Sequence, residues 1–134
     1  TLMRSSAASD VYKRQMENVE TPTALIFSRQ GIAKLPEGTD YEQAAKGAYI
    51  VAGSDENPDV ILVASGSEVS TLEAGCEALR ADGIKVRVVS APSEGLFRGQ
   101  SKEYQESVLP KNAKIFGMTA GLPVTLQGLV GANG

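Results

Sequence analysis

The chain has 134 residues, of which 42% are hydrophobic and 22% charged, with a formal net charge of −3 at pH 7. This length fits one domain, and the composition is ordinary for a soluble globular protein. The negative charge and the 5% of aromatic residues argue against a nucleic-acid-binding surface, which needs clustered Lys and Arg or stacking aromatics. No apolar run reaches the ~20 residues that a membrane-spanning helix needs, so we expect a cytoplasmic protein with no nucleic-acid or membrane partner.

The sequence contains no histidine and a single cysteine, Cys76. Without histidine the commonest general base and metal ligand are missing, as are Ser-His and Cys-His catalytic pairs. Cys76 has no internal disulfide partner and falls on the apolar stripe of a predicted helix, so we interpret it as a small core residue. The composition therefore favours a chain that does not carry out chemistry alone.

Residues 1–15 show no apolar periodicity and no helix cap. Ser5–Gln15 resembles the in-frame translation of a transposase adapter used in DNA library preparation. We therefore predict a non-native, disordered tail and leave it out of the fold. A natural disordered tail is the alternative.

Residues 16–46 are predicted to hold one strand and a linker. Thr23–Ser28 is apolar and follows a proline, which is tolerated at a strand start. Arg29 comes directly after it, at the strand end where α/β proteins usually contact ligands, although the residues alone favour a solvated arginine. The linker that follows has a possible helix cap at Thr39 and one predicted helical turn at Tyr41–Ala45.

The centre of the chain is a predicted βαβ unit. Val60–Ala64 is an unbroken apolar run, which is typical of a strand buried on both faces. The next helix would begin at Ser67, or at Ser65 with Glu68 in a capping box, and Gly83 would end it. Ile84–Ser90 is the second strand, and the helix buries one stripe: Val69, Leu72, Cys76 and Leu79.

The flanking elements complete an α/β pattern. Gly47–Val51 predicts a short strand that is antiparallel to its neighbour or at an edge, because the connection to Val60 is too short for a crossover. After Ser90 we predict an irregular stretch anchored by Leu96 and Phe97, a polar helix Ser101–Leu109, a strand Ala113–Met118 and a last helix starting at Leu122. We therefore predict three layers, with a mostly parallel, mixed sheet between helices.

Motifs for chemistry are scarce. Ser65–Glu68 occupies the place of a Rossmann glycine loop but lacks the GxGxxG pattern, so we interpret it as a helix cap and tight turn and not as a phosphate site. Glu68 and Glu73 are expected on the solvated face of the helix, with no reason to pair them as acid and base. No P-loop, CxxC or HExxH motif occurs.

Four segments, taken in order, resemble the carboxyl-terminal third of transketolase: Pro22–Gln30, Asp59–Val69, Val86–Ser93 and Gln105–Pro110. The similarity covers about Glu20–Gly134. It implies that 16–46 is the last strand of the pyrimidine-binding domain plus a linker. It also implies that 47–134 is the Rossmann-like C-terminal domain, a mixed five-stranded sheet with helices on both sides.

Transketolase transfers a two-carbon ketol unit between ketose and aldose phosphates, using thiamine diphosphate and Mg, and works as a homodimer. The family's cofactor, metal and catalytic residues lie upstream of the matching segments, so we expect none here and an inactive fragment. One functional residue carries over. Arg29, in the motif Ser28-Arg29-Gln30, would bind the terminal phosphate of the sugar through its planar guanidinium.

The sequence also departs from the family. Thr119 stands where the family often has an acidic residue, and the family's closing segment is absent, which predicts a sheet truncated at its C-terminus. Two alternatives stay open: the C-terminal domain of another thiamine-dependent enzyme (deoxyxylulose phosphate synthase or a pyruvate dehydrogenase beta subunit), or a non-catalytic regulatory or dimerisation module. The flanking DNA would separate them.

Overall fold

The computed structural model describes residues 16–22, 24, 26, 29, 31–53 and 57–131. The elements, in chain order, are the 3₁₀ helix η1 (Tyr41–Lys46), β1 (Tyr49–Ala52), β2 (Val60–Ala64), α2 (Glu68–Ala81), β3 (Val86–Ser90), α3 (Glu94–Arg98), α4 (Lys102–Val108), β4 (Lys114–Met118) and α5 (Val124–Val130).

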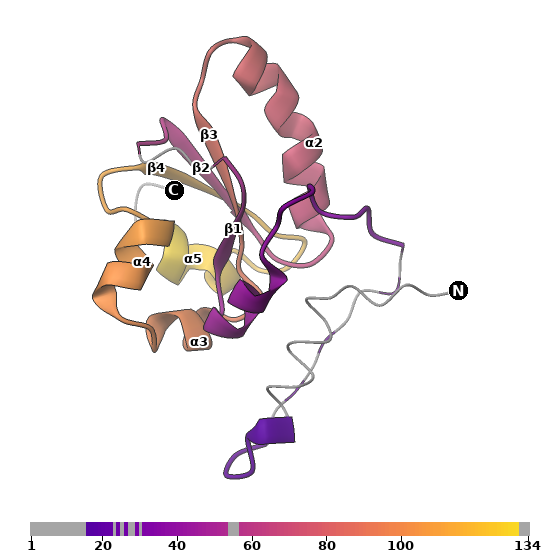
Figure 1. The fold of residues 1–134 in the computed structure, drawn as a ribbon, viewed down its shortest axis with the longest axis vertical. Coiled ribbons are helices and arrows are strands. Elements are labelled where there is room, and N and C mark those ends of the chain that lie inside the picture. Colours follow the sequence, from indigo (N-terminus) through magenta and orange to yellow (C-terminus); the bar gives the residue numbers. More distant parts are fainter. Residues whose placement is uncertain are drawn as a thin grey trace.

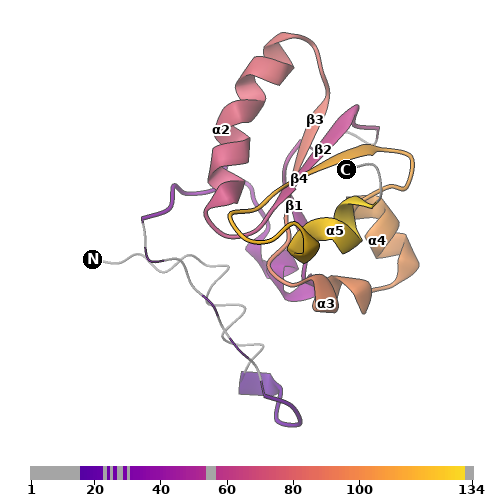
Figure 2. The same cartoon turned by 180° about the vertical axis from the view of Figure 1, so that it is seen from behind.

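The described strands form one four-stranded sheet in the order β1-β3-β2-β4. β2 is parallel to both β3 and β4, whereas β1 is antiparallel to β3. α2 covers one face of the sheet, and α3, α4 and α5 lie on the other (Figure 1 and Figure 2). The predicted three-layer, mixed α/β fold is confirmed, with four described strands where the resemblance implied five. β1 is both at an edge and antiparallel.

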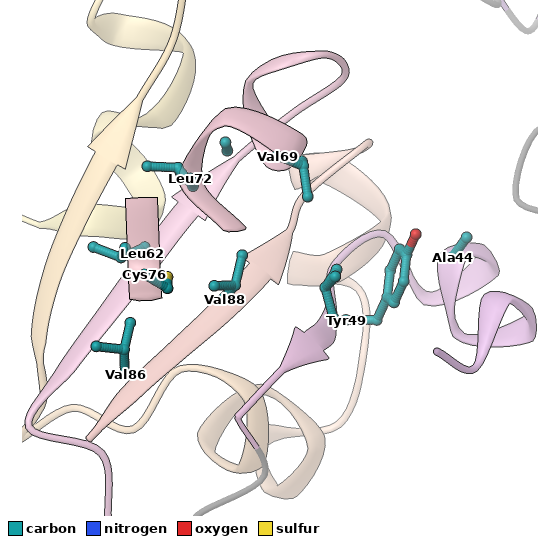
Figure 3. Close-up of a cluster of buried hydrophobic side chains, with 10 residues drawn as sticks. Ala44, Tyr49, Leu62, Val69, Leu72, Cys76, Val86 and Val88 are labelled. Carbon is teal, nitrogen blue, oxygen red and sulfur yellow. The ribbon is translucent and has the colours of Figure 1, made fainter. Parts of the chain in front are cut away.

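The βαβ unit forms because β2 is apolar on both faces. Leu62 and Ala64 pack in the cluster under α2, whereas Ile61 and Val63 pack in the cluster on the opposite face. Figure 3 shows Val69, Leu72 and Cys76 of α2 directed toward the side chains of β2 and β3. These three helix residues are buried and Leu79 packs beside them half-buried, as the sequence periodicity predicts.

The two ends of α2 differ from each other in how well the sequence predicts them. At the C-terminus Gly83 has φ +79°, and Ile84 N–H donates to Leu79 O at 3.0 Å, which is the predicted glycine-terminated helix end. At the N-terminus Ser67 is the cap residue, but its backbone is already helical and its side chain makes no capping bond. Its Oγ donates instead to Glu68 Oε1 at 3.2 Å, so the predicted hydroxyl cap is wrong.

The helices on the second face pack on Ile61, Val63 and Val89 through Phe97, Val108, Leu126 and Leu129. The stretch after Ser90 is not irregular as predicted, because Ser93 Oγ accepts from Leu96 N–H and starts α3. Within α3 only Phe97 is buried, whereas Leu96 is 40% exposed. Leu122, where the last helix was predicted to start, precedes α5 and is 71% exposed.

A buried arginine ties α4 to the sheet. Arg87 is 3% exposed in β3, and its Nη1 donates to the carbonyl oxygens of Ser107 at 2.9 Å and Val108 at 3.1 Å. These carbonyls lie at the C-terminal end of α4, where helical carbonyls lack intrahelical partners and a cation is favoured. The sequence pattern of β3 gives no indication of this contact.

The linker before β1 also departs in detail from the prediction. Asp40, not Thr39, caps η1 by accepting from Glu42 N–H at 3.1 Å. Thr39 Oγ1 donates to Pro36 O at 2.7 Å, so its hydroxyl is used in the preceding turn. Leu35 packs half-buried against the cluster under α2, and this contact fixes the linker to the domain.

The strand predicted at Thr23–Ser28 is not formed at Ala24 and Ile26, which are the two described residues of that stretch. Both are exposed, and Ile26 is 96% exposed, because the described residues offer no neighbouring strand to pair with this segment. The other four residues of the stretch and the predicted tail at 1–15 lie outside the described residues.

Candidate functional site

The carboxyl ends of β2, β3 and β4 open onto one hollow of about 350 Å³. The loop after each strand contributes to its wall, and α5 closes one side. The lining residues are Ser65, Glu68, Ala91, Pro92, Glu94, Thr119, Ala120, Gly121, Thr125, Leu126 and Leu129.

The topology of the sheet explains why the hollow forms here. The chain leaves β2 toward α2 on one face, but it leaves β3 and β4 toward α3 and α5 on the other face (Figure 1). Loops that depart from adjacent strands in opposite directions separate and leave a crevice, which is where open α/β sheets usually bind ligands. This hollow is therefore the candidate site of the described domain.

The polar groups around the hollow are hydroxyls and carboxylates. Thr119 Oγ1 accepts from Gly121 N–H at 3.0 Å and from Thr125 Oγ1 at 3.4 Å, which fixes the loop between β4 and α5. Glu94 Oε1 accepts from Arg98 Nε at 2.7 Å, so this carboxylate is already paired with a cation. Glu68 also lines the hollow, and the two carboxylates disfavour a phosphate or diphosphate ligand there.

The sequence pattern did not predict this site. It indicated a helix cap and tight turn at Ser65–Glu68, and the structure places Ser65 and Glu68 on the wall of the hollow. It did not connect them with the loops after β3 and β4. The common feature is that each contributing loop begins directly after the last residue of a parallel strand.

Arg29 precedes all the lining residues in the sequence and is not one of the residues that line the hollow. Its backbone forms a bend and its side chain is exposed. Ser28 and Gln30, the other members of its motif, lie outside the described residues. The phosphate-binding role of Arg29 therefore stays a prediction.

Cys76 and Glu73 lie on α2 and do not line the hollow. Burial raises the pKa of the Cys76 thiol, an effect that Arg80 opposes and Glu73 reinforces. Glu73 Oε1 accepts from Arg80 Nη1 at 3.2 Å, as an ion pair on the helix surface. Neither residue has the setting of a nucleophile or of an acid–base pair.

Among the residues that the structure describes, no three His, Cys, Asp or Glu side chains come together in a way that could hold a metal ion. Nor does any described helix combine the length and apolar character needed to cross a membrane.

The comparisons with known proteins agree with this fold. The model of the family described as the transketolase-like TK C-terminal domain matches residues 47–134. The chain belongs to this family. The match begins two residues before β1 and includes β1 to β4 and α2 to α5.

Individual relatives give the same assignment. Transketolase 2 of Vibrio parahaemolyticus is 45% identical over 102 residues, which cover 75% of this chain and 15% of that protein. Transketolase from Leishmania mexicana superposes with a TM-score of 0.86 at 30% identity, over 94% of this chain and 18% of that one. Transketolase from Pichia stipitis in complex with sedoheptulose-7-phosphate superposes with a TM-score of 0.75 at 40% identity. This match covers 83% of this chain and 16% of that one. The chain thus spans about a sixth of the length of these relatives.

Proposed function

We propose that this chain is the C-terminal part of a transketolase, an enzyme that transfers a two-carbon ketol unit between sugar phosphates. The observation that carries the proposal is the family match over 47–134, which coincides with the folded domain. The relative from Pichia stipitis is described with sedoheptulose-7-phosphate, which supports sugar phosphates as the substrate class. In this proposal 16–46 joins the preceding domain to the C-terminal one, and 1–15 is not part of the enzyme.

The cofactor proposed for the whole enzyme is thiamine diphosphate with Mg, which supplies the carbanion chemistry. The described residues do not fit a diphosphate group, because Glu68 and Glu94 would repel it at the hollow and Glu94 holds Arg98. We therefore assign the binding of the cofactor and the metal to other parts of the enzyme. The homodimer and the cytoplasmic localisation expected from the sequence stay predictions.

The residue of this chain proposed to touch substrate is Arg29. A guanidinium can donate two parallel hydrogen bonds to a phosphate, and the charge of the exposed side chain is available for such a ligand. Its part is to bind and orient the terminal phosphate of the sugar. No proton transfer is assigned to it.

The test uses the uninterrupted enzyme encoded by the flanking DNA. Arg29→Ala should raise KM for phosphorylated sugars by about 100-fold, because the loss of charge-assisted hydrogen bonds of roughly 1.5–3 kcal/mol corresponds to about 10- to 150-fold. KM for an unphosphorylated ketose should stay within about twofold. The matched control is Lys34→Ala, which removes a nearby exposed cation of the linker. Equal effects on both sugars would contradict the phosphate role.

A further inference from the structure

Residues 35–46, which we call the strap, precede both β1 and the region of the family match. Leu35 at the start of the strap packs half-buried against the cluster under α2, and Ala44 near its end is 1% exposed in the same cluster. Residues 31–34, by contrast, are exposed, and no hydrogen bond among the described residues joins them to the domain. The strap is therefore attached to the domain along its length, unlike the residues that precede it.

The end of the strap leads into the opposite face of the sheet. Ala48, the residue between Gly47 and β1, is buried in the cluster on the face away from α2. Gly47 O accepts from Ser93 N–H at 3.0 Å, so the cap residue of α3 holds the chain at this point. The strap thus ends between the two hydrophobic clusters of the domain.

A side chain from a distant part of the sequence reaches the strap here. The hydroxyl of Tyr104 in α4 donates to Ala48 O at 2.9 Å, with Gln43 Oε1 as a second acceptor at 3.3 Å. Gln43 Nε2 in turn donates to Asp40 Oδ2 at 2.9 Å, and Asp40 is the residue that caps η1. One hydroxyl therefore connects α4 with both ends of η1.

The ring of Tyr104 is held in position on two sides. It meets the ring of Phe97, which is 3% exposed, edge to face, with 6.2 Å between the centroids and 66° between the planes. Lys46 Nζ, at the end of η1, lies 4.4 Å from the centroid of the tyrosine ring. Because these contacts already orient the ring, its hydroxyl loses little conformational freedom in bonding to Ala48 O.

We propose that the Tyr104 hydroxyl is a latch that holds the strap on the domain, which makes Tyr104 a positioning residue for the segment upstream. Leu35 is six residues after Arg29, whereas Gly47 is eighteen residues after it. An extended chain covers about 3.3–3.6 Å per residue, so Arg29 stays within about 20 Å of Leu35 while the strap is closed. With the strap open, it could move to about 60 Å from Gly47. The latch acts in the same way whatever the activity of the whole protein.

The test is limited trypsin digestion of the 134-residue chain, with initial rates followed by mass spectrometry at three sites. Lys34 is exposed before the strap, Lys46 is half-buried within it, and Arg87 is 3% exposed in β3. Cleavage after Lys34 should be fast. Cleavage after Lys46 should be slower because it needs opening of the strap, and cleavage after Arg87 should be slowest because it needs unfolding of the domain.

Tyr104→Phe removes the hydroxyl and keeps an aromatic ring between Phe97 and Lys46. It should accelerate cleavage after Lys46 about fivefold, which corresponds to about 1 kcal/mol for one hydrogen bond. The matched control is Ser107→Ala, which also removes a hydroxyl from α4, but one whose hydrogen bond to Tyr104 O stays within the helix. This control should change the rate after Lys46 by less than about twofold. Equal acceleration by both variants would refute the latch.

A core variant separates opening of the strap from unfolding of the domain. Ile61→Val, at a buried position of β2, should accelerate cleavage after Arg87 about fivefold and cleavage after Lys46 by less than about twofold. The reason is that Ile61 stays packed when only the strap opens. If Ile61→Val accelerated both cleavages equally, the strap would open only together with the whole domain, and the proposal would be wrong.

A measurement on the unmodified chain does not depend on how the variants fold. The amides of Gln43 and Gly47 donate to Asp40 O and Ala44 O within the strap. Their hydrogen exchange should be slower than that of residues 31–34 and faster than that of β2. Exchange as fast as at 31–34 would show that the strap is not held on the domain.

Discussion

The same chemical change, glycine to alanine, should have opposite effects at two positions of this domain. Gly47 lies between η1 and β1, has φ +90° and is buried. Gly75 lies on the exposed side of α2, where an added Cβ would meet nothing within 4 Å. The two sites thus separate the conformational role of glycine from its cost in a helix.

The magnitudes follow from the local geometry. At Gly75 alanine should stabilise the domain by about 0.5–1 kcal/mol, the usual gain over glycine in a helix interior. At Gly47 the left-handed backbone costs alanine about 1–2 kcal/mol. The added Cβ would also collide with the backbone of Ser93, the cap residue of α3, and of Phe97 within α3, and such overpacking costs about 1–3 kcal/mol more. Gly47→Ala should therefore destabilise by about 2–5 kcal/mol.

A third variant isolates the backbone contribution. Gly83 has φ +79°, but an added Cβ would meet nothing within 4 Å. Gly83→Ala should therefore cost only the conformational part, about 1–2 kcal/mol. The order of stability should be Gly75→Ala, unmodified chain, Gly83→Ala and then Gly47→Ala.

Thermal unfolding followed by far-UV circular dichroism measures this order. A change of 1 kcal/mol shifts Tm by roughly 4–8 °C in a domain of this size, so Gly47→Ala should lower Tm by about 10 °C or more. If Gly47→Ala were no more harmful than Gly83→Ala, the close approach of α3 to Gly47 would be wrong. A destabilising Gly75→Ala would contradict the exposed helical position of that residue.

Two further predictions concern the chain as it stands. The purified 134-residue chain, supplied with thiamine diphosphate and Mg, should show no ketol transfer, and measurable turnover would contradict the proposal that the catalytic residues lie elsewhere in the enzyme. The second follows from Cys76, whose pKa is raised by burial from the usual 9.0, so the folded state binds its proton more tightly than the unfolded state. The stabilisation from Cys76 is present below about pH 9 and is lost as the pH rises above it. Between about pH 8 and pH 10.5, Tm should therefore fall less steeply in Cys76→Ala than in the unmodified chain. Identical slopes in the two proteins would show that the thiol titrates alike in both states.

The sequence by itself determined the βαβ unit. The apolar run of β2 and the apolar stripe of α2 are local patterns, and each has one stable solution when strand, helix and strand follow each other closely. The glycine that ends α2 is likewise a local requirement, because a left-handed residue must follow the last turn. Such features depend on near neighbours in the chain and can be inferred from them.

The tertiary structure decided what depends on distant residues. Local pattern could not tell that β1 pairs with β3, or that Phe97 is buried while Leu96 is exposed, because both outcomes depend on which surface the rest of the chain presents. The hollow joins Ser65 to Thr125 only because three strands end at one edge of the sheet. Pairing partners and sites of this kind are fixed by the free energy of non-local contacts, which no window of sequence contains.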